Sequence, residues 1–267
     1  MEPKIEKDNL SKHISDCTEL QQYLRKKGEN HNNYKFYSSI GRIVDIRDRC
    51  SLYLGRGKRW NDIIDRENFN SAKYAFVNFG RCFSFSKNES VAMWMLYGGI
   101  DKFSGMMDFT KKGMEAILKA SQVEIGYFNE DAFFKIKTIF RDSFELYCTD
   151  VIYYGRKENG NYYIKRADEK SAILGNDAFD KLIGCKKALP WQYENECRLI
   201  CRIDRKLVGD ECTTVRINLT GKDLGKSFER IYHGPNYPSS DTKNTLPSNL
   251  DNSIDWSLCD EHCKLKN

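Results

Sequence analysis

The sequence predicts an α+β fold with one main domain, and three observations lead to this prediction. The chain has 267 residues, enough for one large domain or two small ones. Hydrophobic residues make up 40% of it and aromatic residues 13%, which is typical of a chain with a sizeable core and excludes a disordered one. Strand-like and helix-like segments also follow one another without the strict alternation of a βαβ protein.

Membrane-spanning and secreted proteins are not expected from this sequence. No apolar run approaches the ~18 residues that a membrane span needs, and the longest relevant stretch is 92–97. The first residues lack the apolar segment of a secretory signal. We therefore expect a cytoplasmic protein without membrane contact. The net charge of +5 is spread along the chain, so it permits contact with nucleic acid without predicting it.

Ten cysteines raise the question of disulfides or a metal site. In a reducing compartment a disulfide framework is not expected. Zinc sites need paired cysteine or histidine clusters, whereas Cys197 with Cys201, and Cys259 with Cys263, lack a matching second half. We expect no metal and free cysteines that pack as small hydrophobic residues.

The first half of the chain contains a helical extension followed by alternating short elements. Residues 1–33 form the extension, with a helix through Leu20, Tyr23 and Leu24 that packs on the main body. Ser86 and Glu89 have the spacing of a capping box, which starts a helix that ends at Gly98. The segments expected as strands are 34–37, 41–46, 74–85 and 104–109, and a short helix is expected over 111–120.

In the second half, the clearest helix is expected over 130–148. Phe133, Ile136, Phe140 and Phe144 lie at helical spacing there and are assigned to the core. Further elements are a hairpin of 151–154 and 162–164 around Asn159-Gly160, a helix over 177–187, strands over 191–203, 214–219 and 230–233, and an irregular tail over 236–267.

The densest group of charged residues is Glu194, Glu196 and Arg198. Alternate residues of a strand share a face, so these three side chains would project together, opposite Trp191 and Tyr193. Two neighbouring carboxylates suit acid–base or cation-stabilising chemistry, because their repulsion raises the pKa of one. An exposed strand face with a cross-strand ion pair explains the pattern equally well.

Two further segments are candidate binding sites. Ser84 ends a strand beside a helix N-terminus and could orient a ligand, while Trp94 and Tyr97 could stack on it. A cap with core aromatics is the alternative. The segment from Trp60 to Asp65 is assigned to a turn whose carboxylates anchor a loop.

Two other short patterns give weaker evidence for a functional site. His233 ends an expected strand and is the most central of four histidines. Gly55-Arg-Gly57 lacks the remaining parts of a dinucleotide fingerprint.

Taken in order, these motifs resemble a widespread bacterial domain family of unknown function. The matching segments are Tyr34-Lys-Phe-Tyr37, Trp60-Asn-Asp-Ile-Ile-Asp65, Cys82-Phe-Ser84, Met93-Trp94, Tyr97, Gly105 to Phe109, Val151-Ile-Tyr153, Lys187 and Trp191 to Leu199. The resemblance covers 34–235, about three quarters of the chain. The family's three-part pattern is in turn similar to that of the ADP-ribosyltransferase superfamily, which cleaves NAD and passes ADP-ribose to a target.

This resemblance implies a fold, a co-substrate and a set of roles. The fold is a split β-sheet core over 34–235 with peripheral helices, and the co-substrate is NAD. Glu196 would act at the nicotinamide ribose and stabilise a positively charged transition state, and Glu194 would orient the acceptor. Ser84 would hold the ribose or support Glu196, and Trp94 or Tyr97 would pack against the nicotinamide.

The first strand departs from the superfamily pattern, because Tyr37 stands where the family carries arginine. Either Tyr34 and Lys35 replace that charge, or Arg42 or Arg47 reaches the site, or NAD is not the ligand.

The resulting hypothesis is an ADP-ribosyltransferase-like toxin or effector, in phage defence or a toxin–antitoxin pair, which would have a neutralising partner. Its acceptor would be nucleic acid, with RNA favoured, or protein. Three alternatives stay open: NAD hydrolysis at the same site, a non-catalytic binding module for nucleic acid or protein, and a nuclease.

Overall fold

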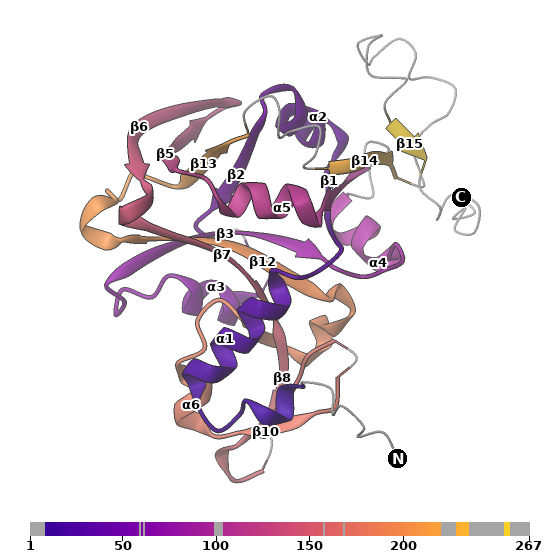
Figure 1. The fold of residues 1–267 in the computed structure, drawn as a ribbon, viewed down its shortest axis with the longest axis vertical. Helices are drawn as coiled ribbons and strands as arrows, with labels where there is room; N and C mark the ends of the chain where they lie inside the picture. Colours follow the sequence, from indigo (N-terminus) through magenta and orange to yellow (C-terminus); the bar gives the residue numbers. More distant parts are fainter. Residues whose placement is uncertain are drawn as a thin grey trace, which may run out of the picture.

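The computed structural model describes residues 9–58, 60, 62–98, 104–156, 158–167, 169–219, 228–234 and 254–256. They form a mixed α/β body that is rich in sheet and carries several helices (Figure 1). The strands are β1 (Asn33–Ser39), β2 (Ser51–Gly55), β3 (Phe76–Ser84), β4 (Ser104–Thr110), β5 (Gln122–Asn129), β6 (Ala132–Phe140), β7 (Phe144–Asp150), β8 (Ile152–Arg156), β9 (Tyr162–Lys165), β10 (Ala172–Leu174), β11 (Lys186–Ala188), β12 (Glu196–Asp204), β13 (Thr214–Asn218), β14 (Phe228–His233) and β15 (Ile254–Trp256). The helical elements that the text uses are α1 (Cys17–Gly28), α2 (Ile40–Asp48), α3 (Ile63–Phe69), α4 (Val91–Met93), the π-helical turn η2 (Trp94–Gly98), α5 (Lys111–Leu118), α6 (Asn176–Asp180) and the 3₁₀ turn η5 (Leu189–Glu194).

The large sheet has the order β15-β14-β4-β1-β3-β2-β13-β5-β6, with β12 paired to β3 and β7 paired to β12. β12 pairs with β3 along its whole length. In contrast, β3 meets β1 only at Lys35 opposite Ser84, and meets β2 only at Gly55 opposite Gly80. The sheet is therefore divided at β3, and its parts enclose one apolar core together with α2 and α5.

Alternation along the strands separates this core from a polar face. Tyr34, Phe83 and Cys197 are buried in the core. Their neighbours Lys35, Ser84 and Glu196 point to the opposite face, because successive strand residues alternate.

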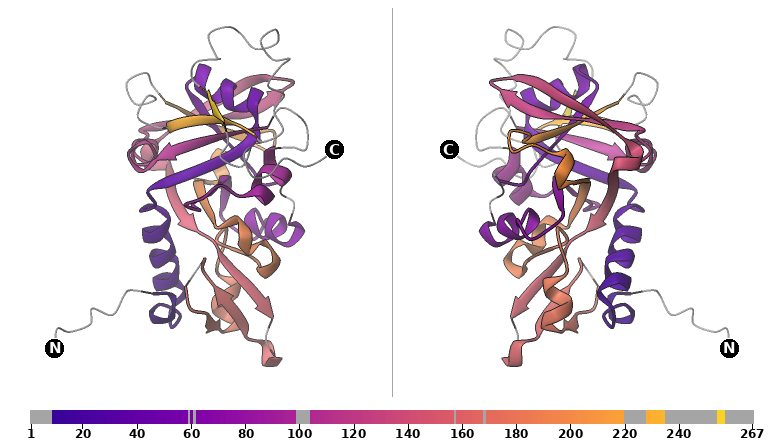
Figure 2. Two further views of the ribbon diagram at one scale, coloured as in Figure 1. Left: turned by 90° about the vertical axis from the view of Figure 1, so that its right-hand side faces the viewer. Right: turned by 90° about the vertical axis from the view of Figure 1, so that its left-hand side faces the viewer.

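A smaller sheet, of order β10-β9-β8-β11, lies at one end of the molecule, and α1 runs beside it toward β7 (Figure 2). Leu20, Tyr23 and Leu24 of α1 join the apolar core of this small sheet, as their spacing predicted. The predicted helix of the N-terminal extension is thus confirmed, and it packs on the small sheet.

Several other sequence predictions are confirmed. They are the strands near 34–37, 74–85, 104–109, 214–219 and 230–233, and the helix within 111–120. The hairpin is also found, since β8 pairs with β9 and the loop places Asn159 at φ 69° and Gly160 at φ 80°.

The helix predicted over 130–148 is wrong. The segment forms the β5–β6 hairpin and β7, with Glu130 at φ 51° in the connecting turn. Phe140 is 65% exposed and Ile136 44% exposed, so these residues are not core. Pairing with a partner strand outweighed the helical spacing, as tertiary context does for aromatic and β-branched residues.

The strand predicted over 41–46 is also wrong, because these residues lie in α2. Ile40, Ile43 and Ile46 are buried at intervals of three residues, which is a helical period. The helix predicted from Ser86 begins later, since Ser90 is its N-cap and accepts a hydrogen bond from the Met93 amide at 3.4 Å.

The helix predicted over 177–187 is reduced to α6, and β11 follows it. The strand predicted from Trp191 begins at Glu196, because η5 occupies 189–194. The predicted tail over 236–267 lies outside the described residues except for β15, which pairs with β14.

Among the described cysteines, Cys148, Cys185, Cys197, Cys201 and Cys212 are buried and free, which confirms the expectation for them. Within the described residues, no helix combines the length and apolar character that crossing a membrane would need.

Gly28 lies where α1 packs directly against the backbone of β7, and this close approach leads to a stability prediction. A Cβ atom at Gly28 would lie 2.7 Å from the Thr149 backbone. We expect Gly28→Ala to cost about 1–3 kcal/mol of unfolding free energy, because neither backbone can yield easily. Gly41→Ala is the matched control: its Cβ would meet nothing within 4 Å in α2, so a small gain of about 0.5–1 kcal/mol is expected. Urea unfolding compares them, and equal stabilities would contradict the prediction.

Candidate functional site

A polar row crosses three neighbouring strands of the large sheet. Lys35 of β1 lies opposite Ser84 of β3, and Ser84 lies opposite Glu196 of β12. Directly opposed residues of antiparallel strands share a face, so the three side chains project together. All three are buried. Three segments far apart in the sequence therefore meet at one place.

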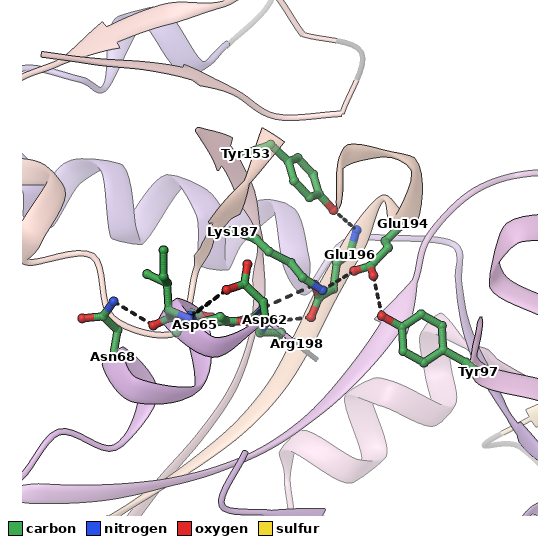
Figure 3. Close-up of polar contacts among 11 residues, drawn as sticks. Asp62, Asp65, Asn68, Tyr97, Tyr153, Lys187, Glu194, Glu196 and Arg198 are labelled. Atoms are coloured by element: carbon green, nitrogen blue, oxygen red, sulfur yellow. Dashed lines mark hydrogen bonds and ion pairs between the residues drawn. The ribbon is translucent and has the colours of Figure 1, made fainter. Parts of the chain in front are cut away.

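Glu196 belongs to a buried ion network with Arg198 and Asp65 (Figure 3). The Arg198 guanidinium donates from Nε to Glu196 Oε1 at 2.7 Å, and from Nη1 and Nη2 to the two Asp65 oxygens at 2.8 and 2.5 Å. Arg198 is fully buried and its guanidinium carbon lies 4.5 Å from the Trp60 ring centroid. The segment 60–65, predicted to be a structural loop, thus supplies a counter-ion to the site.

Lys187 of β11 connects the two glutamates. Its Nζ donates to Glu194 Oε2 at 2.5 Å and to Glu196 Oε2 at 3.2 Å. The Tyr97 hydroxyl donates to Glu194 Oε1 at 2.5 Å, and the Glu196 amide donates to the Tyr153 hydroxyl at 2.8 Å. Figure 3 shows Tyr97, Glu194, Lys187 and Glu196 as one connected chain.

The two glutamates meet for a different reason from the one that the sequence suggested. Glu194 ends η5 and is not on the strand, while Asn195 adopts a left-handed conformation with φ 43°. Glu196 and Arg198 do share a face of β12, as predicted. The turn at Asn195 brings Glu194 back to the same lysine that holds Glu196.

The network gives the two glutamates opposite pKa shifts. Burial and the charge of Glu196 raise the pKa of Glu194 to about 7, although Lys187 and Tyr97 oppose the rise. Burial also acts to raise the pKa of Glu196, but Arg198 and Lys187 outweigh it and hold that pKa well below its ordinary value. Glu196 is therefore a fixed negative charge, and Glu194 can exchange a proton near neutral pH.

Tyr34 is not brought to this face. It points into the main core, where its hydroxyl donates to the Gly28 carbonyl at 2.8 Å. Lys35 is on the polar face, and its ammonium donates to the carbonyls of Ser86 and Lys87, the latter at 2.9 Å. Burial lowers the pKa of Lys35.

Tyr37 and Trp94 form an aromatic cluster next to the row. Their ring centroids are 5.0 Å apart in an edge-to-face arrangement, and both rings are buried. Trp94 Nε1 donates to the Glu89 carboxylate at 3.0 Å. Tyr97, from the same π-helical turn as Trp94, is the aromatic residue that reaches Glu194.

Arg42 and Arg47, the other candidates for the missing first-strand charge, lie on α2 and not in the polar row. Arg42 is exposed, and Arg47 Nε donates to Asp48 at 2.8 Å. His233 belongs to β14, and its side chain lies outside the description.

Three residues of the network were not assigned to the site from the sequence. They are Asp65, Lys187 and Tyr153. Each lies in a segment that carried the family resemblance, and that resemblance was the only sequence signal that could have pointed to them. Two of their contacts join segments that are distant in the sequence, because Asp65 is 133 positions from Arg198 and Tyr153 is 43 positions from Glu196. Lys187 is only seven and nine positions from its two glutamates, but a strand and a turn must fold back before they meet.

One group of potential metal ligands occurs among the described residues, formed by His31, Asp150 and Cys197. Asp150 accepts hydrogen bonds from His31 Nε2 at 2.6 Å and from Arg166 Nε at 2.7 Å, while Cys197 donates to the Gly28 carbonyl at 3.5 Å. These bonds join β7 to the segments that follow α1 and β9, and join β12 to the end of α1. The group therefore has a structural explanation without an ion.

Comparison of the chain with protein-family models, with curated proteins and with solved structures gave no match.

Proposed function

We propose that the protein is an ADP-ribosyltransferase-like enzyme that uses NAD as co-substrate and modifies a macromolecule. The observation that carries the proposal is the register of Lys35, Ser84 and Glu196 on one face of three adjacent strands. The superfamily pattern requires a cation on the first strand, a hydroxyl on a middle strand and a glutamate on a late strand. The proposed split-sheet core of that superfamily would be the part of the large sheet around β3.

In this proposal Lys35, and not Tyr37, takes the place of the first-strand arginine. Lys35 is a cation beside Ser84, whereas Tyr37 packs against Trp94. A lysine supplies a point charge for a phosphate or ribose oxygen, without the two-pronged geometry of arginine. Ser84 would hold the ribose next to it.

The two glutamates would divide the chemistry between them. The glycosidic bond breaks with its electron pair leaving on neutral nicotinamide, and the ribosyl cation is stabilised by the fixed charge of Glu196. The acceptor nucleophile then bonds to the same carbon, and its proton passes to Glu194. A carboxylate with a pKa of about 7 is suited to that role near neutral pH.

The direct test follows labelled NAD in a whole-cell extract with purified wild type and Glu196→Gln. We expect label in a macromolecular fraction with the wild type and none with the variant, because glutamine cannot supply the fixed charge. Glu145→Gln, which removes a half-exposed carboxylate on β7, is the matched control and should transfer label normally. NAD that stays intact with the folded wild type, after any neutralising partner is removed, would contradict the proposal.

A non-catalytic binding module is the second candidate, and one observation favours it. The buried charge of Arg198 is already paired with Glu196 and Asp65 inside the protein. Such a network can hold elements in place without acting on a ligand. Under this alternative, Glu196→Gln would lower stability and leave no NAD-dependent activity to lose. NAD hydrolysis without transfer would instead release free ADP-ribose and nicotinamide in the same assay.

A further inference from the structure

Arg81 of β3 lies where the large sheet divides. β12 occupies one edge of β3 along its whole length, so β1 and β2 share the other edge. β1 pairs there only at Ser84 and β2 only at Gly80, and residues 81–83 lie between these two contacts. The connection from β1 to β2 across this division is α2. Arg81 therefore stands at the point where the two parts of the sheet separate.

The Arg81 side chain lies on the core side of the sheet, and the polar row of the candidate site lies on the other side. Phe79 and Phe83 belong to the main core and share a face of β3 with Arg81, because alternate residues of a strand do so. Arg81 Nε donates to the Tyr53 carbonyl at 2.6 Å, and the guanidinium carbon lies 4.3 Å from the Phe36 ring centroid. This arginine is thus separate from the proposed NAD site.

No carboxylate neutralises Arg81 in the part of the chain that the structure describes. Arg25, Arg202 and Arg216 are half-buried as Arg81 is, and each of the three forms an ion pair with a glutamate. Among the described residues, the terminal nitrogens Nη1 and Nη2 of Arg81 have no hydrogen-bond partner, yet neither is fully enclosed by protein. A half-buried cation without a counter-ion is a position where an anion would be stabilised.

Arg42 of α2 adds a second cation beside Arg81, and it has no ion-pair partner among the described residues either. Burial and the charge of Arg42 lower the pKa of Arg81 to about 10, so Arg81 is still charged at neutral pH. Asp45 and Asp48, the acids of α2, already pair with other arginines. The repulsion between Arg81 and Arg42 is therefore not offset by these acids.

We infer that Arg81 and Arg42 form a binding site for a phosphate group where β1 and β2 separate. Because Nε is bonded to a carbonyl, Nη1 and Nη2 of Arg81 remain as a pair of donors that two phosphate oxygens can accept together. Arg42 contributes charge from α2. A phosphate held there would offset the repulsion between the arginines and connect α2 to β3. The ligand is either free phosphate or the phosphate group of a nucleotide, since both present the same oxygens.

The test is isothermal titration calorimetry with inorganic phosphate at pH 7.5, with sodium chloride keeping the ionic strength constant. We expect saturable binding by the wild type, and a rise in its stability to urea with phosphate concentration, because a ligand of the folded state stabilises that state. Arg81→Met should abolish both effects. Arg42→Ala, at an exposed position, should weaken phosphate binding about fivefold, which corresponds to the about 1 kcal/mol of an exposed charge pair.

Arg202→Met is the matched control. Arg202 is half-buried against an aromatic ring, with its guanidinium carbon 4.1 Å from the Phe76 ring centroid, but it is paired with Glu145. This variant should bind phosphate as the wild type does. A parallel titration with adenosine 5′-monophosphate distinguishes the two sources. Tighter binding than that of inorganic phosphate, weakened by Arg81→Met, identifies a nucleotide, whereas weaker binding identifies the free ion; both results support the site.

Three results would overturn the inference. They are a wild type that binds neither compound saturably, an Arg81→Met variant that binds phosphate as tightly as the wild type, and an equal loss of binding in Arg202→Met. Circular dichroism checks that each variant is folded. If Arg81→Met does not fold, Arg42→Ala decides the question, and wild-type affinity for phosphate in that variant would also overturn the inference. The test is independent of the proposed function, because it involves neither NAD nor the glutamates.

Discussion

Arg198→Met is expected to lower the free energy of unfolding by about 3–5 kcal/mol, the usual cost of leaving a buried charge without its partner. Arg198 is fully buried and pairs with both Asp65 and Glu196. Methionine fills a similar volume but donates no hydrogen bond. The two carboxylates would face each other across the gap, and at least one would have to take up a proton.

The matched control for this prediction is Arg202→Met, four residues along the same strand. Arg202 is 22% exposed and bonds to Tyr147 at 2.9 Å and to Glu145 at 3.5 Å. Partly exposed pairs of this kind contribute about 1 kcal/mol or less. Urea unfolding at pH 7.5 measures both variants, and equal losses would show that the Arg198 network is not a buried ion cluster.

A triple variant separates charge from packing. Replacing Arg198 by Met, Asp65 by Asn and Glu196 by Gln removes the unpaired charges as well as the cation. Replacement of a whole buried ion cluster by neutral groups is often close to neutral for stability. We therefore expect the triple variant to recover much of the stability that Arg198→Met loses. If it recovers none, the loss comes from packing against Trp60 and not from uncompensated charge.

Short-range sequence patterns predicted the strands and turns of the site better than they predicted the hydrogen bonds and ion pairs between its residues. The alternation of Glu196 and Arg198 correctly placed both on one face of a strand. The alternation of charges could not reveal the left-handed turn at Asn195. A single residue with positive φ ends the strand there, but the charged residues keep the same spacing in the sequence. The alternation also could not pair Arg198 with Asp65, a contact that exists only after α3 packs on the sheet.

The largest error in the fold has a similar cause. Aromatic and β-branched residues between 130 and 148 recur at intervals that suit a helix, yet the same residues favour strands when partners are present. In this segment β6 pairs with the adjacent β5, and β7 pairs with β12. β12 lies far away in the sequence, and the helical spacing gave no sign of either pairing. The hairpin at Asn159-Gly160 was predictable because its determinants are two adjacent residues.

Glu194→Gln is expected to change how stability depends on pH. Folding raises the pKa of Glu194 from an ordinary value near 4.5 to about 7. Between these values the folded state binds more protons than the unfolded state, so the stability of the wild type falls as pH rises from about 4.5 to 7. The side chain is nearly inaccessible, so the full effect is on the order of 3 kcal/mol, at about 1.4 kcal/mol for each pKa unit.

Glutamine does not titrate, so the variant should lose this slope and become progressively more stable than the wild type toward pH 8. Urea unfolding at pH 5, 6, 7 and 8 measures the difference between them. Glu115→Gln, at an exposed position on α5, should give a curve parallel to that of the wild type. The opposite shift of Glu196 does not interfere, because a lowered pKa affects stability only as pH falls below about 4.5.

The same titration connects stability with the proposed chemistry. If Glu194 is the group that accepts the proton of the acceptor, NAD turnover should decline as pH falls below about 7, and Glu194→Gln should remove that decline together with most transfer. A variant that keeps the wild-type pH slope of stability would show that another carboxyl of the cluster carries the shared proton. Asp65 is the remaining candidate, because Glu196 is held ionised by Arg198 and Lys187. In that case the proton would lie on Asp65, which is joined to Glu196 through Arg198, and Glu194 would not be the group that takes up the proton of the acceptor.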